Sequence, residues 1–221
     1  EPPAPVTEPE KTFEEVLDEH PVSIQVNGQW QTFPNAKAAE EASYEEYKAN
    51  LRRNAKNFRI TDEHLGEGGP KAKFQANVNA IRLLKELEAA GQQASPEQQE
   101  VLSRYVGWGG LSDAFDPEKP AWALEYAQLK ELLTPEEYAA ARSSTLNAHY
   151  TSPTVIQAIY EAVDRMGFET GNILEPSMGV GNFFGMLPEK MRNSRLYGVE
   201  LDPVSGRIAK QLYPKADITV G

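Results

Sequence analysis

The residues with the clearest chemical potential lie in one stretch of the 221-residue chain, Ile173–Phe184, which reads ILEPSMGVGNFF. A short apolar run ends at Glu175, a loop with Gly179 and Gly181 follows, and a helix is expected beyond it. A strand, a glycine turn and a helix start form a cradle for a nucleotide-like ligand, because glycine lets the backbone approach the ligand closely. The next apolar run ends at Glu200, in the position where open α/β folds bind ribose hydroxyls.

A second candidate segment, His149–Pro153 (HYTSP), stands just before an expected helix with an apolar face. Backbone amides at a helix start attract negative charge, and the hydroxyls of Thr151 and Ser152 could add hydrogen bonds to a carboxylate. The simpler alternative is that Ser152 only caps the helix, which accounts for the serine but not for the whole string.

The elements around these segments alternate between strand and helix. NILEP, LYGVEL and ADITV are expected strands, and they are separated by expected helices at 182–187 and 203–212. Such alternation predicts a parallel sheet with helices on its faces. Upstream, Asn27-Gly28 between alternating runs predicts a hairpin of Val22–Val26 and Gln29–Phe33. The expected domains are a disordered linker at 1–12, the hairpin segment at 13–35, a helical region at 36–148 and the α/β segment at 149–221.

Composition narrows the class of protein. Hydrophobic residues make up 40% of the chain and charged residues 25%, a balance typical of a soluble globular protein. The chain has no cysteine, and its three histidines are far apart, so neither disulfides nor a metal site are expected. No signal peptide or membrane span is recognisable, and we expect a cytoplasmic protein with no membrane partner. The net charge of −11 argues against broad electrostatic capture of nucleic acid.

Basic residues between positions 36 and 59 could still form a local contact with nucleic acid. Their spacings of four, four and three would place them on one face of a helix extending to about Arg59. A stripe of this kind contacts phosphates or is simply a solvated face, and the solvated face is the more common case. The stripe consists of Lys48, Arg52, Lys56 and Arg59.

Three further residues are candidates for nucleic-acid contact. Lys71 and Lys73 follow a glycine turn and could hold an anion, although we favour the simpler interpretation, a loop that ends with Pro70 at the first helical position. Trp108 lies among glycines in RYVGWGG. Its ring could stack on a base, but we favour a role as a plug between helices.

Together, HYTSP before a helix, LEPSMGVGNFF and LYGVELD resemble the cofactor-binding half of the S-adenosylmethionine-dependent adenine-N6 DNA methyltransferases. More narrowly, NFRITDEHLGEGGPKAKFQANVNAI, RYVGWGG and STLNAHYTSPTVI resemble the methyltransferase region of large methylase–helicase proteins of bacterial mobile elements and phages. The resemblance covers roughly residues 45–221. It implies a truncated Rossmann-like α/β core of about three parallel strands, preceded by a helical array and a small β-hairpin.

The resemblance also implies S-adenosylmethionine as the cofactor and assigns roles to matching residues. Glu175 would pair with the ammonium of the cofactor, Glu200 would accept the ribose hydroxyls, and Leu201 would lie against adenine. A dinucleotide-dependent dehydrogenase is disfavoured, because Asn182-Phe183 replaces the small residue that pyrophosphate needs. The cofactor-binding candidates are His149, Tyr150, Thr151, Ser152, Glu175, Pro176, Ser177, Gly179, Gly181, Asn182, Phe183, Glu200, Leu201 and Asp202.

One absence qualifies this expectation. Family members carry a catalytic tetrapeptide of the Asn-Pro-Pro-Tyr type after the fourth strand, and no such string occurs in these 221 residues. We therefore expect an inactive fragment of a methyltransferase, with no catalytic residue of its own. The parent would act on DNA and carry a helicase in the same polypeptide. The alternative is a non-catalytic module that positions DNA or the helicase, as in an anti-restriction or conjugation factor.

Overall fold

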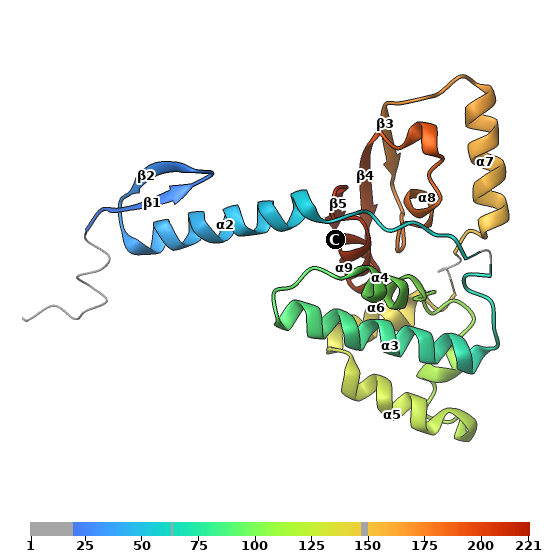
Figure 1. Ribbon diagram of the computed structural model, residues 1–221. Coiled ribbons are helices and arrows are strands. Elements are labelled where there is room, and N and C mark those ends of the chain that lie inside the picture. Colours follow the sequence, from blue (N-terminus) through green and yellow to red (C-terminus); the bar gives the residue numbers. More distant parts are fainter. Residues whose placement is uncertain (1–19, 63, 147–149) are drawn as a thin grey trace, which may run out of the picture. The chain divides into compact units, whose positions relative to one another are not determined.

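The computed structural model describes residues 20–62, 64–146 and 150–221, and the side chains of residues 47–54 lie outside that description. Two compact units divide between Asn54 and Ala55, and each is treated by itself (Figure 1). Within the described residues, no helix combines the length and the apolar character needed to cross a membrane.

From residue 20 onward, where the structure describes it, the smaller unit consists of a hairpin and one long helix. Strands β1 (Val22–Val26) and β2 (Gln29–Phe33) pair antiparallel, as the sequence predicts. The turn residues Asn27 and Gly28 have φ angles of 52° and 74°, the left-handed values that a two-residue hairpin turn requires. Helix α2 (Ala36–Asn54) packs against both strands.

Helix α2 ends five residues earlier than the sequence suggests. Beyond Asn54 the backbone is extended and belongs to the larger unit, where hydrogen bonds to later parts of the chain hold it. The Phe58 N–H donates to the Leu212 carbonyl at 2.7 Å, and the Ile60 N–H donates to the Gly185 carbonyl at 3.0 Å. A helix could not make these bonds, because its own ladder would use the same N–H groups.

The predicted basic stripe on one helix face is therefore wrong. Lys56 and Arg59 lie on the extended segment after α2, while Lys48 and Arg52 belong to the helix. The side chains of Lys48 and Arg52 lie outside the described residues, so their possible contact with nucleic acid stays a prediction.

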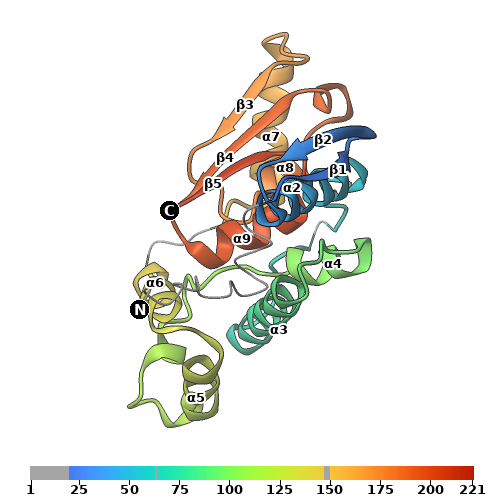
Figure 2. The same cartoon turned by 90° about the vertical axis from the view of Figure 1, so that its left-hand side faces the viewer.

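The larger unit contains the predicted parallel sheet. Strands β3 (Asn172–Glu175), β4 (Arg195–Glu200) and β5 (Asp217–Val220) lie in the order β3-β4-β5. Helix α8 (Asn182–Gly185), shorter than predicted, connects the first two strands, and α9 (Pro203–Leu212) connects the last two. Helix α9 packs against β4 and β5 (Figure 2). The opposite face of the sheet carries exposed Leu174 and Val199.

All but one of the remaining helices described in the larger unit precede the sheet in the chain. Ser95 and Thr134 each form a capping box, in which the cap and the third helical residue bind each other's backbone N–H groups. The helices are α3 (Pro70–Ala89), α4 (Pro96–Ser103), η1 (Ser112–Phe115), η2 (Pro120–Trp122), α5 (Ala123–Leu132), α6 (Pro135–Ser144), α7 (Pro153–Arg165) and the short η3 (Glu189–Met191) between α8 and β4.

These helices and the sheet share one core, so the chain does not separate into compact units between residues 148 and 149. Helices α3, α4 and α6 all contact α9. At that contact the carboxylate of Glu137 binds Lys85 at 2.8 Å and Arg207 at 2.6 Å. Arg207 also forms a two-pronged pair with Glu88, at 2.8 and 2.9 Å. These ion pairs therefore join the helical array to α9, the helix that follows Glu200.

Candidate functional site

A cavity of about 480 Å³ opens at the carboxyl ends of β3 and β4. This is where open parallel sheets bind ligands, because strand ends and the loops after them converge there. The structure brings ten of the fourteen predicted cofactor-binding residues to its lining. They are Tyr150, Thr151, Glu175, Ser177, Gly179, Asn182, Phe183, Glu200, Leu201 and Asp202.

Glu200 is held firmly at the end of β4. One carboxylate oxygen accepts the Gly179 N–H at 2.6 Å, and the other accepts the Asp202 N–H at 2.8 Å. Each oxygen retains a second lone pair, so the carboxylate can still accept hydrogen bonds from a ligand. Next to it, Leu201 is 82% exposed and adds an apolar surface to the same cavity.

Glu175, at the end of β3, is held quite differently. Its Oε2 atom is buried and has no hydrogen-bond partner. Burial, together with the negative charge of Glu200, raises the pKa of the Glu175 carboxyl to about 8. A buried carboxyl in this state favours a proton or a cationic ligand, because an unpaired charge in a poorly solvated place is costly.

The glycines of the loop serve packing more directly than ligand approach. Gly179 and Gly181 have φ angles of 56° and 84°, which other residues rarely adopt. A Cβ added to Gly179 would lie 2.9 Å from Cε1 of Tyr150, and one added to Gly181 would lie 2.6 Å from Cε2 of Tyr213. Both glycines therefore make room for tyrosine rings of the protein itself.

Four predicted residues do not line this cavity in the described structure. Ser152 caps α7 without a side-chain hydrogen bond and lines a neighbouring cavity of about 370 Å³. Pro176 is exposed and Gly181 is buried, and neither reaches the lining. His149 lies outside the described residues.

Part of the wall comes from the helical array, which sequence reasoning did not connect with the site. Gly107 precedes Trp108, and Ala140, Ser143 and Ser144 lie on α6. Both serine hydroxyls donate to carbonyls of their own helix, those of Ala140 and Ala141. Two segments quoted from the sequence contain wall residues: RYVGWGG contains Gly107, and STLNAHYTSPTVI begins at Ser144.

The candidates for nucleic-acid contact are mostly engaged within the protein. Trp108 is 1% exposed and packs edge-on against Phe74, Tyr105 and Phe115, so its ring is unavailable for a base. The structure thus confirms the interpretation favoured from the sequence, in which Trp108 fills the core between helices. Lys71 pairs with Glu125 at 2.6 Å, whereas Lys73 lines the 370 Å³ cavity.

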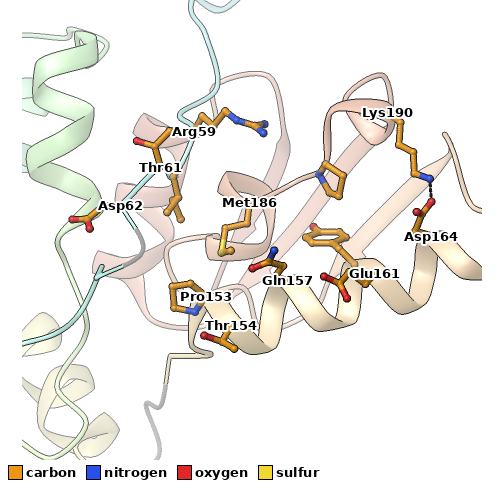
Figure 3. A pocket seen from close by; sticks show the side chains of 13 residues that line it. Arg59, Thr61, Asp62, Pro153, Thr154, Gln157, Glu161, Asp164, Met186 and Lys190 are labelled. Carbon is orange, nitrogen blue, oxygen red and sulfur yellow. Dashed lines mark ion pairs between the residues drawn. The ribbon is translucent and has the colours of Figure 1, made fainter.

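A larger cavity, of about 610 Å³, lies between the extended segment after α2 and helix α7 (Figure 3). Arg59, another candidate for nucleic-acid contact, lies at this cavity and donates to the Leu187 carbonyl at 3.1 Å. Lys190 on the far side is paired with Asp164. Three acidic side chains against two basic ones line this cavity, a balance that does not favour phosphate.

Metal ligands are not clustered in the described part of the chain. No group of three or more histidine, aspartate or glutamate side chains there could hold a metal ion. The chemistry of the 480 Å³ cavity therefore rests on its two carboxyls, its hydroxyls and its backbone groups.

Comparison with known proteins adds two partial similarities. No family model and no solved structure matches the chain. The chain is 24% identical over 155 residues to the defense against restriction protein B of Escherichia phage P1, a match that covers 70% of this chain and 5% of that protein. It is 46% identical over 43 residues to the type II methyltransferase M.CvrRI of Paramecium bursaria Chlorella virus XZ-6E, which covers 20% of this chain and 11% of that protein. The chain thus spans a small part of its curated relatives, and it is similar to a phage anti-restriction protein over most of its length and to a methyltransferase over a short stretch.

Proposed function

We propose that the chain binds S-adenosylmethionine in the 480 Å³ cavity, as part of an adenine-N6 DNA methyltransferase region joined to a helicase. The observation that carries the proposal is the pair of carboxyls at the ends of adjacent strands, one anchored by backbone N–H groups and one unpartnered. The short similarity to a type II methyltransferase supports the same class.

The residues of the cavity fit this cofactor. The carboxyl of Glu175, which lines the cavity, would pair with the ammonium of the amino-acid end, and that positive charge would stabilise the ionised form of a group that burial now disfavours. The anchored carboxylate of Glu200 would accept the ribose hydroxyls, and exposed Leu201 would be covered by adenine. Bound there, S-adenosylmethionine would supply an activated methyl group on a sulfonium, and no metal is needed for its transfer. The negative charge of Glu200 at this cavity would repel the phosphates of a nucleotide.

Isothermal titration of the chain with S-adenosylmethionine tests this proposal. We expect saturable binding that weakens by roughly 10- to 100-fold in Glu200→Ala, because a charged hydrogen-bonding group contributes about 1.5–3 kcal/mol. Glu169→Gln, which changes an exposed carboxylate, serves as the matched control. ATP at the same concentration should give no comparable heat.

Absence of binding in the wild-type chain would contradict the proposal, and so would an affinity that Glu200→Ala leaves unchanged. Methyl transfer itself is not assigned to these 221 residues, since they contain no Asn-Pro-Pro-aromatic string. DNA and a helicase in the same polypeptide are proposed as the partners of the complete protein.

A second function is favoured by one specific observation, the longer similarity to the phage anti-restriction protein. In that case the fold would position DNA or a helicase without using the cofactor. Fluorescence anisotropy with a labelled DNA duplex at low salt, together with the cofactor titration, distinguishes the two functions. Binding of DNA by a chain that takes up no S-adenosylmethionine would favour the second function, whereas cofactor binding sensitive to Glu200 would favour the first.

A further inference from the structure

One polar side chain of the helical array, Asn77 on α3, is fully buried behind the wall of the 480 Å³ cavity. Its amide nitrogen donates to the Gly107 carbonyl at 2.6 Å, and its amide oxygen accepts the Val106 N–H at 2.8 Å. A side-chain amide that binds two consecutive residues in this way fixes the course of the backbone there, because a buried peptide group without a partner is unfavourable.

The backbone that Asn77 fixes lies directly against Tyr150. A Cβ added to Gly107 would lie 2.6 Å from Cε2 of the Tyr150 ring, and one added to Gly179 would lie 2.9 Å from Cε1 on the opposite edge. The ring therefore occupies a slot between two glycines, one from the helical array and one from the loop after β3. Tyr150, Gly107 and Gly179 all line the 480 Å³ cavity.

The hydroxyl end of the ring is tied to the sheet side of the site. The Tyr150 hydroxyl lies 3.4 Å from Oγ of Ser205, a residue of α9. Ser205 is itself held by the cap of that helix, where its N–H donates to Asp202 at 2.7 Å. A shift of the Tyr150 ring would thus disturb both the loop after β3 and the start of α9.

We propose that Asn77 and Gly107 are positioning residues that hold the Tyr150 ring in this slot and thereby give the cavity the shape that S-adenosylmethionine requires. The ligand in this statement rests on the proposed function, whereas the slot does not. Asn77 does not line the cavity, so it acts on the ligand only through Gly107 and Tyr150.

The chain offers a matched pair of substitutions for testing the slot. Gly107 and Gly110 belong to the same loop and have φ angles of 68° and 74°, so alanine is similarly strained at both positions. At Gly107 the added methyl group would strike Tyr150, whereas at Gly110 it would meet nothing within 4 Å. Any difference between Gly107→Ala and Gly110→Ala therefore reports on the contact with Tyr150.

Two measurements on the full chain are needed. The first is the NMR signal of the Tyr150 ring in protein with ¹³C-labelled tyrosine, identified by its loss in Tyr150→Phe. The second is calorimetric titration with S-adenosylmethionine. Gly107→Ala should move the ring signal and weaken binding at least tenfold, whereas Gly110→Ala should leave both as in the wild type. Asn77→Ala, provided that its far-ultraviolet circular dichroism stays native, should move the same ring signal.

An unmoved ring signal in Gly107→Ala would overturn the claim that Gly107 positions the Tyr150 ring, whether or not the wild-type chain binds the cofactor. A moved signal with unchanged affinity would overturn the link between the slot and the cofactor. If the wild-type chain binds no S-adenosylmethionine, the proposed function fails, and the ring signal alone then decides whether Asn77 and Gly107 position Tyr150.

Discussion

Glu175 and Glu200 end two neighbouring strands of the sheet, and their carboxyl oxygens are held in opposite ways. Both oxygens of Glu200 accept backbone N–H groups, whereas Oε2 of Glu175 is buried without a partner. The negative charge of Glu200 adds to the effect of burial, and together they raise the pKa of Glu175 to about 8. The cavity thus contains one fixed carboxylate and one carboxyl that holds a proton at neutral pH.

The first prediction concerns the stability of the ligand-free chain. The pKa of Glu175 is about 8 in the folded protein and near 4.5 when unfolded, so the folded state binds more protons between these values. The stability that the protonated form provides is complete below about pH 4.5 and is lost as the pH rises through 8. Inside this window Glu175 should lower the free energy of unfolding by up to about 1.4 kcal/mol per pH unit.

Urea denaturation of the wild-type chain and of Glu175→Gln at pH 5.5 and 7.5 measures this effect. The difference between the two proteins isolates Glu175 from other titrating groups. Glu175→Gln should gain stability relative to the wild type at the higher pH. Parallel pH dependence in both proteins would show that Glu175 titrates normally.

The second prediction concerns the proton of the Glu175 carboxyl when a ligand binds, and it rests on the proposed function. A cationic ammonium favours ionised Glu175, so binding of S-adenosylmethionine near pH 7 should release about one proton. The affinity should rise with pH up to about 8. Titrations in phosphate and in Tris, whose ionisation enthalpies differ, should give different apparent heats for the wild type and equal heats for Glu175→Gln. Equal heats in the wild type would contradict proton release.

The third prediction concerns the ion pairs between the array and α9. Burial alone would raise the pKa of Glu137, but hydrogen bonds from Lys85, the Thr134 N–H and Arg207 outweigh it and lower the pKa. Glu137→Ala leaves two cations without their shared partner and should lower the free energy of unfolding by about 2–4 kcal/mol. Glu136→Ala changes an exposed carboxylate on the same helical turn and should cost less than about 0.5 kcal/mol. Similar losses in urea denaturation of both variants would argue against the network.

The fourth prediction sets two opposing effects of one methyl group against each other. Alanine normally stabilises a helix interior relative to glycine by about 1 kcal/mol. At Gly206, however, the added Cβ would lie 2.6 Å from Cγ2 of Val220, between α9 and β5. Overpacking of this kind costs about 1–3 kcal/mol, so Gly206→Ala should destabilise the protein on balance. A raised melting temperature would refute this, and exposed Lys210→Ala on the same helix is the control.

Local patterns in the sequence were sufficient for much of the fold. The Asn27-Gly28 turn and the order of strands and helices from β3 onward depend on neighbouring residues. The end of α2 was missed because residues 55–60 have no helix-breaking residue. Their extended course depends on backbone bonds to Gly185 and Leu212, which are far away in the sequence.

The candidate site, like the fold, was predictable from the sequence only in part. Glu175 and Glu200 follow from their positions at strand ends, and both line the cavity. The contributions of Gly107 and of helix α6 were not predictable, because they arise from packing between segments that are distant in the chain. The packing of tyrosine rings against Gly179 and Gly181 was not predictable for a related reason, since Tyr150 and Tyr213 come from other segments of the chain.

The extended residues after α2 determine where a shortened protein that contains only the larger unit can begin. The Phe58 and Ile60 N–H groups bind carbonyls of α9 and α8, and Asn57 accepts the Lys215 N–H at 3.0 Å. A shortened protein that starts at Thr61 would lose all three bonds and uncover part of the core against which Phe58 packs. A protease-trimmed domain that keeps the 480 Å³ cavity intact should therefore begin at Ala55, even though residues 55–60 contain no regular secondary structure.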